Sequence, residues 1–268
     1  MENRFEILAG SFSLIGSQIS HLDVTASTMD VAWDSARDGA PDGSVIIADH
    51  QSAGRGRHDR DWVSKQGQDI LCSVVLRPRV ALAGELLMIA ALAVTDVANG
   101  YGIETGIKWP NDVQVAGKKL AGVIAESKTG PELGNSDGES DRISAVVGIG
   151  LNVNFDPSTH HDVAPNSTSL SVELGRDLDR QEVFEKLVSA LDSRYSIILA
   201  GGTVVPAWRE RLSTLCREVT IIGGVAGVSM DLHGLAHDVD SLGRLIVRDE
   251  NGRDWPVSAG EVTVRDIS

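Results

Sequence analysis

Residues 107–126 read Ile-Lys-Trp-Pro-Asn-Asp-Val-Gln-Val-Ala-Gly-Lys-Lys-Leu-Ala-Gly-Val-Ile-Ala-Glu and decide the expected fold. Pro110 cannot donate to a strand ladder, so it ends the short strand that precedes it. The apolar runs 113–115 and 120–126 flank a turn at 116–118, which predicts a β-hairpin. The polar residues lie at the breaks between these strands, where binding sites are usually built. The stretch therefore predicts a sheet that carries its chemistry at strand ends.

The flanking regions predict a core that mixes helices and strands, which is an α+β fold class. Short apolar runs bounded by Gly, Pro or Asp predict strands, and they cover 43–49, 69–76 and 143–153. Apolar residues at helical spacing predict helices over 26–37 and 86–97. The second is apolar nearly all round, as a buried helix is. Asp179 and Glu182 have capping-box spacing, which predicts a helix from there to about Leu199.

The sequence pattern of the chain changes at about Leu215. From there, short Val/Ile runs alternate with glycine-containing turns, and Asn251-Gly252 is a strong hairpin signal. Some fifty residues of this pattern predict a small β-barrel. We therefore expect a catalytic domain over 1–214 and a small β-barrel domain over 215–268.

Composition and charge exclude several classes of function. The chain of 268 residues has a net charge of −14, so it lacks the clustered basic surface of a nucleic-acid-binding protein. It contains no run of 18 apolar residues to cross a membrane, and its acidic N-terminus is unlike a signal peptide. Cys72 and Cys216 lie in apolar stretches and are expected to be reduced core thiols, which favours a cytoplasmic protein. His160-His161 in a polar loop is not expected to hold a metal.

The only dense basic cluster is the segment 54–62, which reads Gly-Arg-Gly-Arg-His-Asp-Arg-Asp-Trp. Its three arginines carry fixed N–H donors and a permanent charge, and its two glycines let backbone amides approach a ligand. Such a loop suits phosphates or a carboxylate. Scattered arginines are also common in ordinary surface loops. On an acidic protein, the cluster favours a small anionic ligand.

Other polar residues at strand ends and turns could complete a site. Ser27 and Thr28 supply hydroxyls, Gln51 follows a strand, and Lys108, Asn111 and Asp112 surround the proline break. Each has an ordinary structural explanation as a helix cap or a turn, and Trp109 as a core aromatic. Gly148-Ile-Gly150 is not a dinucleotide fingerprint, because Asn152-Val-Asn154 follows in place of a third glycine and a helix.

Taken together, these motifs resemble the biotin–protein ligases. The resemblance is carried by Gly54-Arg-Gly-Arg57 with Arg60 and Trp62, by Lys108-Trp-Pro-Asn-Asp112, by Lys119-Leu-Ala-Gly122 and by Gly148-Ile-Gly-Leu-Asn152. The motifs span residues 25–155 in the family's order. Two positions depart from the pattern: Met29 stands where the family usually has asparagine, and Asp59 where it usually has glycine.

The resemblance implies a mixed-sheet core of the biotin/lipoyl ligase type followed by an SH3-like β-barrel. It implies a ligase that uses ATP and Mg²⁺ to convert biotin to biotinyl-5′-AMP. The biotin is then transferred to a lysine of a biotin carboxyl carrier domain. Biotin, ATP and this carrier are the expected partners.

The resemblance also implies roles for particular residues. The catalytic residues would be Lys119, Arg57 and Asp112, with Asp112 as a Mg²⁺ ligand or a base. The biotin-binding residues would be Ser27, Thr28, Gln51, Gly54, Arg55, Lys119 and Gly122. The residues that bind ATP or the adenylate would be Arg55, Arg57, Arg60, Trp62, Lys108, Asn111 and Asn152.

Two alternatives fit the sequence less well. A lipoyl or octanoyl transferase shares the fold superfamily, but no segment like Arg-Arg-x-Ser-Gly-Gly-Gly is present. A biotin-sensing transcriptional repressor would need a winged helix-turn-helix before the core, and 26 residues before Ser27 are too few for one. The ligase is the expected function.

Overall fold

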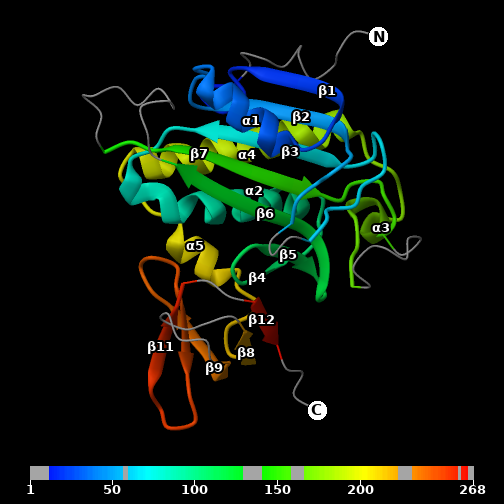
Figure 1. The fold of residues 1–268 in the computed structure, drawn as a ribbon. Coiled ribbons are helices and arrows are strands. Elements are labelled where there is room, and N and C mark those ends of the chain that lie inside the picture. Colours follow the sequence, from blue (N-terminus) through cyan, green and yellow to red (C-terminus); the bar gives the residue numbers. More distant parts are fainter. Residues whose placement is uncertain are drawn as a thin grey trace.

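A computed structural model describes residues 12–56, 60–128, 141–157, 166–222 and 231–258, and the backbone of 261–264. Its centre is a seven-stranded sheet in the order β1-β2-β3-β7-β6-β5-β4 (Figure 1). The strands are β1 Ile19–Thr25, β2 Ser44–Gln51, β3 Ile70–Leu76, β4 Gly106–Lys108, β5 Asp112–Val115, β6 Lys118–Lys128 and β7 Ser144–Leu151. β1 pairs with β2 in parallel and the other neighbours are antiparallel, so the expected mixed sheet is confirmed.

Helices cover both faces of this sheet. They are α1 Thr28–Arg37, the 3₁₀ helix η3 Val80–Glu85, α2 Leu86–Gly100, α3 Leu170–Leu174, α4 Arg180–Leu199 and α5 Val205–Glu210. α1 packs over β2, β3 and β7, whereas α2 and α4 pack together on the opposite face (Figure 1). The face with α1 is covered only in part, and the uncovered part is where the candidate site lies.

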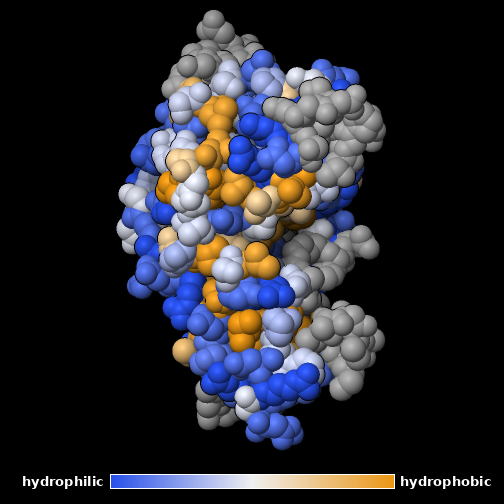
Figure 2. Space-filling view, turned by 90° about the vertical axis from the view of Figure 1, so that its left-hand side faces the viewer, coloured by the Kyte–Doolittle hydropathy of each residue, from blue (hydrophilic) through white to orange (hydrophobic). Residues whose placement is uncertain are grey.

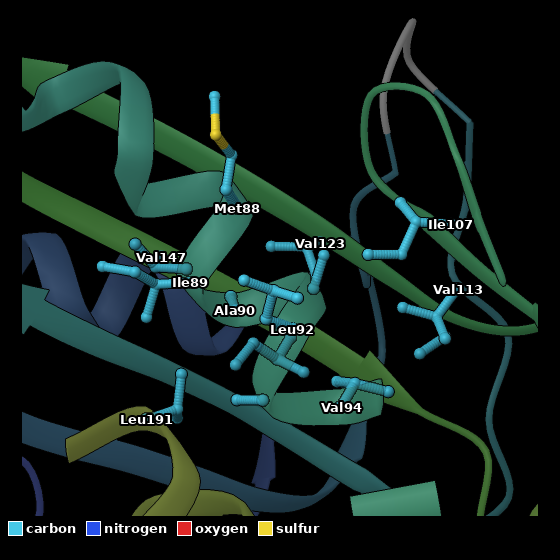
Figure 3. Close-up of a cluster of buried hydrophobic side chains, with 14 of the residues drawn as sticks. Met88, Ile89, Ala90, Leu92, Val94, Ile107, Val113, Val123, Val147 and Leu191 are labelled. Carbon is cyan, nitrogen blue, oxygen red and sulfur yellow. The ribbon is translucent and has the colours of Figure 1, made fainter. Parts of the chain in front are cut away.

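α2 is the central helix of the main core. Eleven of its fifteen residues are buried, and Figure 3 shows Leu92 and Val94 among side chains from the sheet such as Val123 and Val113. The segment Val80–Gly100 is also long and apolar enough to cross a membrane by composition alone. Because most of α2 is enclosed by the sheet and by α4, its apolar character is explained by its place in the core.

Two predicted helix starts are confirmed by their caps. The Ser27 hydroxyl accepts a hydrogen bond from the Met29 amide at 3.3 Å, and the Asp179 carboxylate accepts one from the Gln181 amide at 2.8 Å. Both contacts satisfy amides at a helix N-terminus that would otherwise lack a partner. Glu182 pairs with Lys186 at 3.3 Å.

The C-terminal strands form a second, five-stranded antiparallel sheet in the order β11-β10-β9-β8-β12. They are β8 Glu218–Ile222, β9 Leu232–Val239, β10 Leu245–Arg248, β11 Asp254–Val257 and β12 Glu261–Val264. β11 and β12 stand at opposite ends of the strand order, so the sheet is open rather than the closed barrel expected. The tip of this smaller body, at the bottom of Figure 2, is mostly hydrophilic.

Trp109 joins the two sheets. It is 3% exposed, its amide donates to the Thr214 hydroxyl at 2.8 Å, and its indole Nε1–H donates to the Gly243 carbonyl at 3.0 Å. The peptide bond to Pro110 is cis. Trp109 is therefore a buried aromatic of the core, which is the structural explanation that the sequence offered for it.

One expectation about the cysteines is wrong. Cys72 is buried in β3, but Cys216 is exposed. Cys216 lies in the connection between the two sheets, where its φ of 60° and the hydrogen bond from its amide to Ala236 fix the backbone. The apolar neighbours in sequence pack inward while the thiol points outward. His160-His161 lies outside the described residues.

Candidate active site

A buried polar cluster from three elements forms one end of the site. The Gln51 side-chain oxygen accepts hydrogen bonds from the Thr28 amide at 2.7 Å and from the Thr28 hydroxyl at 3.0 Å. The Thr28 hydroxyl also lies 2.8 Å from that of Ser73. α1, β2 and β3 supply these groups, and Ser73 is fully buried. The sequence analysis missed Ser73, whose only signal was a single hydroxyl within an apolar strand.

Glycines on two adjacent strands form the floor of the site. Gly122 of β6 stands opposite Gly150 of β7 in the strand register. A Cβ at Gly150 would lie 2.4 Å from Trp62 Cε2, and one at Gly148 would lie 2.9 Å from Met29 Sδ. The missing side chains thus let Trp62 and Met29 lie directly on the backbone. Gly148 and Gly150 had been noted as a motif but not as site residues.

A β-bulge places the cationic end of the site on the same face. Residues 119 and 122 are an odd number apart, so a regular strand would point them to opposite faces. The register of β5 with β6 shifts between Val113 and Gln114, which leaves Leu120 unpaired. Lys119 therefore points to the face of Gly122 and Asp112. Its Nζ lies 2.8 Å from Asp112 Oδ1 and 5.5 Å from the centre of the Trp62 ring.

The two ends of the glycine–arginine loop, residues 54–56 and 60–62, pair with each other next to this floor. The Trp62 amide donates to the Gly54 carbonyl at 2.9 Å, and the Gly56 amide donates to the Arg60 carbonyl at 2.6 Å. Arg55 forms an ion pair of 2.7 Å with Asp30 of α1, and both side chains are exposed. Arg57 and Asp59 lie outside the described residues.

The pocket bounded by these groups has a volume of about 450 Å³, its open mouth included. The predicted site residues in its wall are Ser27, Thr28, Gln51, Arg55, Trp62, Asn111, Lys119 and Gly122. Asp112 adjoins the wall through Lys119. Gly54, Arg60, Lys108 and Asn152 are described but lie outside the wall, and Lys108 lines a different surface.

The two asparagines brace the backbone. The side-chain amide of Asn111 donates to the Val123 carbonyl at 2.7 Å, and that of Asn152 donates to the Thr168 carbonyl at 2.9 Å. Both residues are buried. These contacts tie β5 to β6 and tie the end of β7 to the start of α3. The two asparagines expected to bind ATP or the adenylate thus hold the framework of the site.

Two carboxylates at the ends of β2 and β3 have shifted pKa values: Asp69 is buried, and Asp49 is half-buried. Burial raises the pKa of Asp69 to about 6, although the amide of Val153 donates to it at 2.9 Å. Burial also acts to raise the pKa of Asp49, but hydrogen bonds from His21 and Arg180 outweigh it and lower that pKa.

The carboxylates offer little to a resident metal ion. His21, Asp23 and Asp49 could converge on a metal, but Arg180 Nη1 already lies 2.6 Å from Asp49 Oδ1. Asp112 is a single carboxylate paired with Lys119. Protein sites for Mg²⁺ usually combine one or two carboxylates with substrate phosphates. Asp112 alone therefore does not fit a resident magnesium site.

The geometry suits a ligand with three different parts. The neutral cluster at Thr28 and Gln51 can hydrogen-bond a polar head, and the apolar wall that Trp62 and Met29 form on the glycine floor can contact a flat apolar body. Lys119 can pair with an anionic end. The Trp62 Nε1–H is buried and has no hydrogen-bond partner in the part of the chain that the structure describes, so it is available to a ligand oxygen.

Comparison with known proteins agrees with this geometry. Residues 21–135 match the model of the biotin/lipoate A/B protein ligase family. The biotin–[acetyl-CoA-carboxylase] ligase of Mycobacterium tuberculosis is 38% identical over 264 residues, which cover 92% of this chain and 90% of that protein. The bifunctional ligase/repressor BirA of Bacillus subtilis is 36% identical over 249 residues, covering 89% and 72%.

A solved structure shares the fold. The biotin protein ligase from Aquifex aeolicus, in complex with biotin and ATP, aligns with a TM-score of 0.74 at 24% identity. The alignment covers 92% of this chain and 98% of that one. Fold, pocket and similarity over nearly the whole chain lead to one conclusion: the protein belongs to the biotin–protein ligase family.

Proposed function

We propose that this protein uses ATP to convert biotin to biotinyl-5′-AMP and then transfers the biotin to a lysine of a biotin carboxyl carrier domain. One observation carries the proposal: a single pocket connects the polar cluster at Thr28 and Gln51 to Lys119 across a glycine floor. A ligand with a ureido head, a ring body and a carboxylate tail fits these parts in that order. The names and biotin complexes of the relatives support the assignment.

In the first step, a carboxylate oxygen of biotin attacks the α-phosphorus of ATP. The bond to the β-phosphate breaks, and pyrophosphate leaves. Negative charge builds on the phosphate oxygens, so a cation already in place at Lys119 lowers the barrier. Asp112 holds Lys119 by the 2.8 Å ion pair and so positions that cation. Arg55 and Arg57 are proposed to bind the same phosphate.

In the second step, the amine of the acceptor lysine attacks the biotinyl carbonyl. The bond to the phosphate oxygen breaks and AMP leaves. The attacking amine loses a proton, and Asp112 is the proposed acceptor because it pairs with Lys119, which lines the pocket. Mg²⁺ is proposed to enter as the ATP complex, since Asp112 alone does not make a resident site.

A mass measurement tests the proposal. The protein is incubated with biotin, Mg²⁺–ATP and an apo biotin carboxyl carrier domain, and the carrier is then weighed by mass spectrometry. We expect the mass of one biotinyl group to be added, and none when ATP is omitted or when the target lysine is arginine. A parallel reaction with lipoate tests the other branch of the family. Transfer of lipoate without transfer of biotin would contradict the proposal.

We propose that the chain binds no nucleic acid and no membrane and works in the cytoplasm, on the strength of its net charge of −14 and its composition. We also propose the division into a catalytic domain over 1–214 and a C-terminal domain over 215–268.

A further inference from the structure

A second concave surface, the cationic groove, lies where the β4 edge of the large sheet meets the C-terminal sheet. Its walls include Lys108, Gln114, Lys118, Asn166, Ser213 and Arg217. Its volume is about 2230 Å³ with the open mouth included, compared with about 450 Å³ for the pocket. Figure 1 shows β4 and β5 directly above β8 and β12, and the bridge between Ile107 and Leu212 joins the two parts. The groove therefore has room for part of a macromolecule.

The basic residues of this groove lack carboxylate partners within the described part of the chain, as do Lys65, Lys128 and Arg176 elsewhere on the surface. Lys108, Lys118 and Arg217 have no ion pair with any residue that the structure describes. Elsewhere the cations with a carboxylate partner are Arg37, Arg55, Arg79, Lys119, Arg180, Lys186, Arg194, Arg209, Arg244 and Arg248. On a chain of net charge −14, this is a local concentration of unneutralised positive charge.

The groove also contains two acids. Glu173 accepts a hydrogen bond from the Thr168 hydroxyl at 2.5 Å, and Glu104 is exposed in the groove wall. The wall therefore carries three basic side chains, Lys108, Lys118 and Arg217, and two acidic ones, so positive groups outnumber negative ones by one.

The groove adjoins the cationic end of the pocket. Lys118 and Lys119 are consecutive, yet Lys118 lines the groove and Lys119 lines the pocket. The Lys119 amide donates to the carbonyl of Asn166, a groove residue, at 2.7 Å. Lys108 stands opposite Asp112 in the strand register, and Asp112 pairs with Lys119. A protein seated in the groove would have its surface next to the reacting end.

We propose that the cationic groove is the docking surface for the acceptor protein and that it receives an acidic face bordering the acceptor's target lysine. The proposal rests on the proposed function, because only a transfer to a protein needs a macromolecule at this edge of the site. Complementary charge also overcomes the repulsion that an acidic enzyme would otherwise exert on an acidic partner.

The test is the variant Lys118→Glu/Arg217→Glu. Neither residue belongs to the pocket, so formation of biotinyl-adenylate should match that of the wild type. The KM for an apo carrier domain should rise at least about tenfold, with little change in kcat, because rim charges act mainly on encounter. In the wild type, the same KM should rise with ionic strength, and in the variant this dependence should be weaker.

The control is Arg37→Glu/Arg79→Glu, which makes the same change in net charge on exposed residues at the opposite end of the sheet. It should leave the KM for the carrier nearly unchanged. A carrier whose acids around the target lysine are changed to lysine should regain activity with the groove variant. If the charge reversals impair folding, as judged by Tm, Lys118→Gln/Arg217→Gln provides the milder test.

Two results would overturn the proposal. An unchanged KM for the carrier in the groove variant shows that the carrier docks elsewhere. A raised KM for ATP with an unchanged KM for the carrier shows that the groove serves nucleotide phosphates. Failure of the wild type to form adenylate would instead refute the proposed function, and it is recorded separately from the carrier KM.

Discussion

Two parts of one strand, on one face of the sheet, are built in opposite ways. Val146 of β7 is fully buried beside Val75 of β3, under Trp33 and Ala36 of α1. Farther along the same strand and on the same face, Gly148 and Gly150 have no side chain at all. α1 covers the first part, whereas the pocket lies over the second.

In β7, the residue that stabilises the fold and the glycines that form the pocket floor are therefore only a few positions apart. The covered part gains free energy by removing apolar surface from water. The glycine part forgoes that gain, and the space left free admits Trp62 and, in the proposed function, the ligand. Changes in the pocket part should therefore alter chemistry, and changes in the covered part should alter stability.

The largest effect is expected for Lys119→Ala at the pocket end. Loss of a cation placed at the transferring phosphate should slow adenylate formation by about 10²–10³-fold. The side chain is only partly buried and lies outside the apolar core, so Tm should change little. Pyrophosphate release and a thermal melt measure the two quantities. Lys118→Ala, at the adjacent residue, is the matched control and should release pyrophosphate like the wild type. A Lys119 variant with wild-type release would remove Lys119 from the mechanism.

Gly150→Ala tests the floor directly. The new methyl group would lie 2.4 Å from the Trp62 ring, so the ring must leave its place over the pocket. A displacement of this size should reduce adenylate formation by at least about 100-fold. Gly100→Ala is the control, because a Cβ there meets nothing within 4 Å. Equal rates for the two variants would show that the floor needs no glycine.

The variant Asp69→Asn tests whether the buried charge of Asp69 lowers the free energy of unfolding. Burial raises the folded-state pKa to about 6 from 3.8, so the folded protein holds this proton more tightly than the unfolded chain. The contribution of Asp69 to stability is then fully present below about pH 4 and is lost as the pH rises through about 6, a change of at most about 3 kcal/mol.

Asparagine keeps an acceptor for the Val153 amide and carries no charge. The variant should therefore be more stable than the wild type at pH 7, and the two should converge near pH 4. Denaturant unfolding across this pH range measures the difference, with the exposed change Asp177→Asn as control. A variant that is less stable at pH 7 would contradict the expected role of burial.

The smallest effect is expected for Val146→Ala in the covered part. Removing two methyl groups from a fully buried site should lower the free energy of unfolding by about 2 kcal/mol. The rate of adenylate formation should stay within about twofold at a temperature where both proteins are folded. Denaturant unfolding and pyrophosphate release decide the outcome. A large loss of activity here would break the separation between the two parts.

Local signals in the sequence determined much of the framework. Ser27 and Asp179 begin their helices because each can accept a bond from an amide of the first turn. Pro110 ended a strand, and the apolar run of α2 gave a buried helix. The motif residues Thr28, Gln51, Trp62 and Lys119 do meet in one pocket. These features depend on neighbours in sequence or on motif strings, so they could be predicted.

Features that depend on packing could not be predicted from the sequence. Ser73 joins the polar cluster only because α1 lies over β3, and Lys119 reaches the pocket face only through the bulge at Leu120. The exposure of Cys216 and the open second sheet follow from how the two sheets join. The cationic groove likewise exists only where residues far apart in sequence meet. Sequence determined which side chains this protein has at its strand ends, and tertiary structure decided which face and which neighbour each one received.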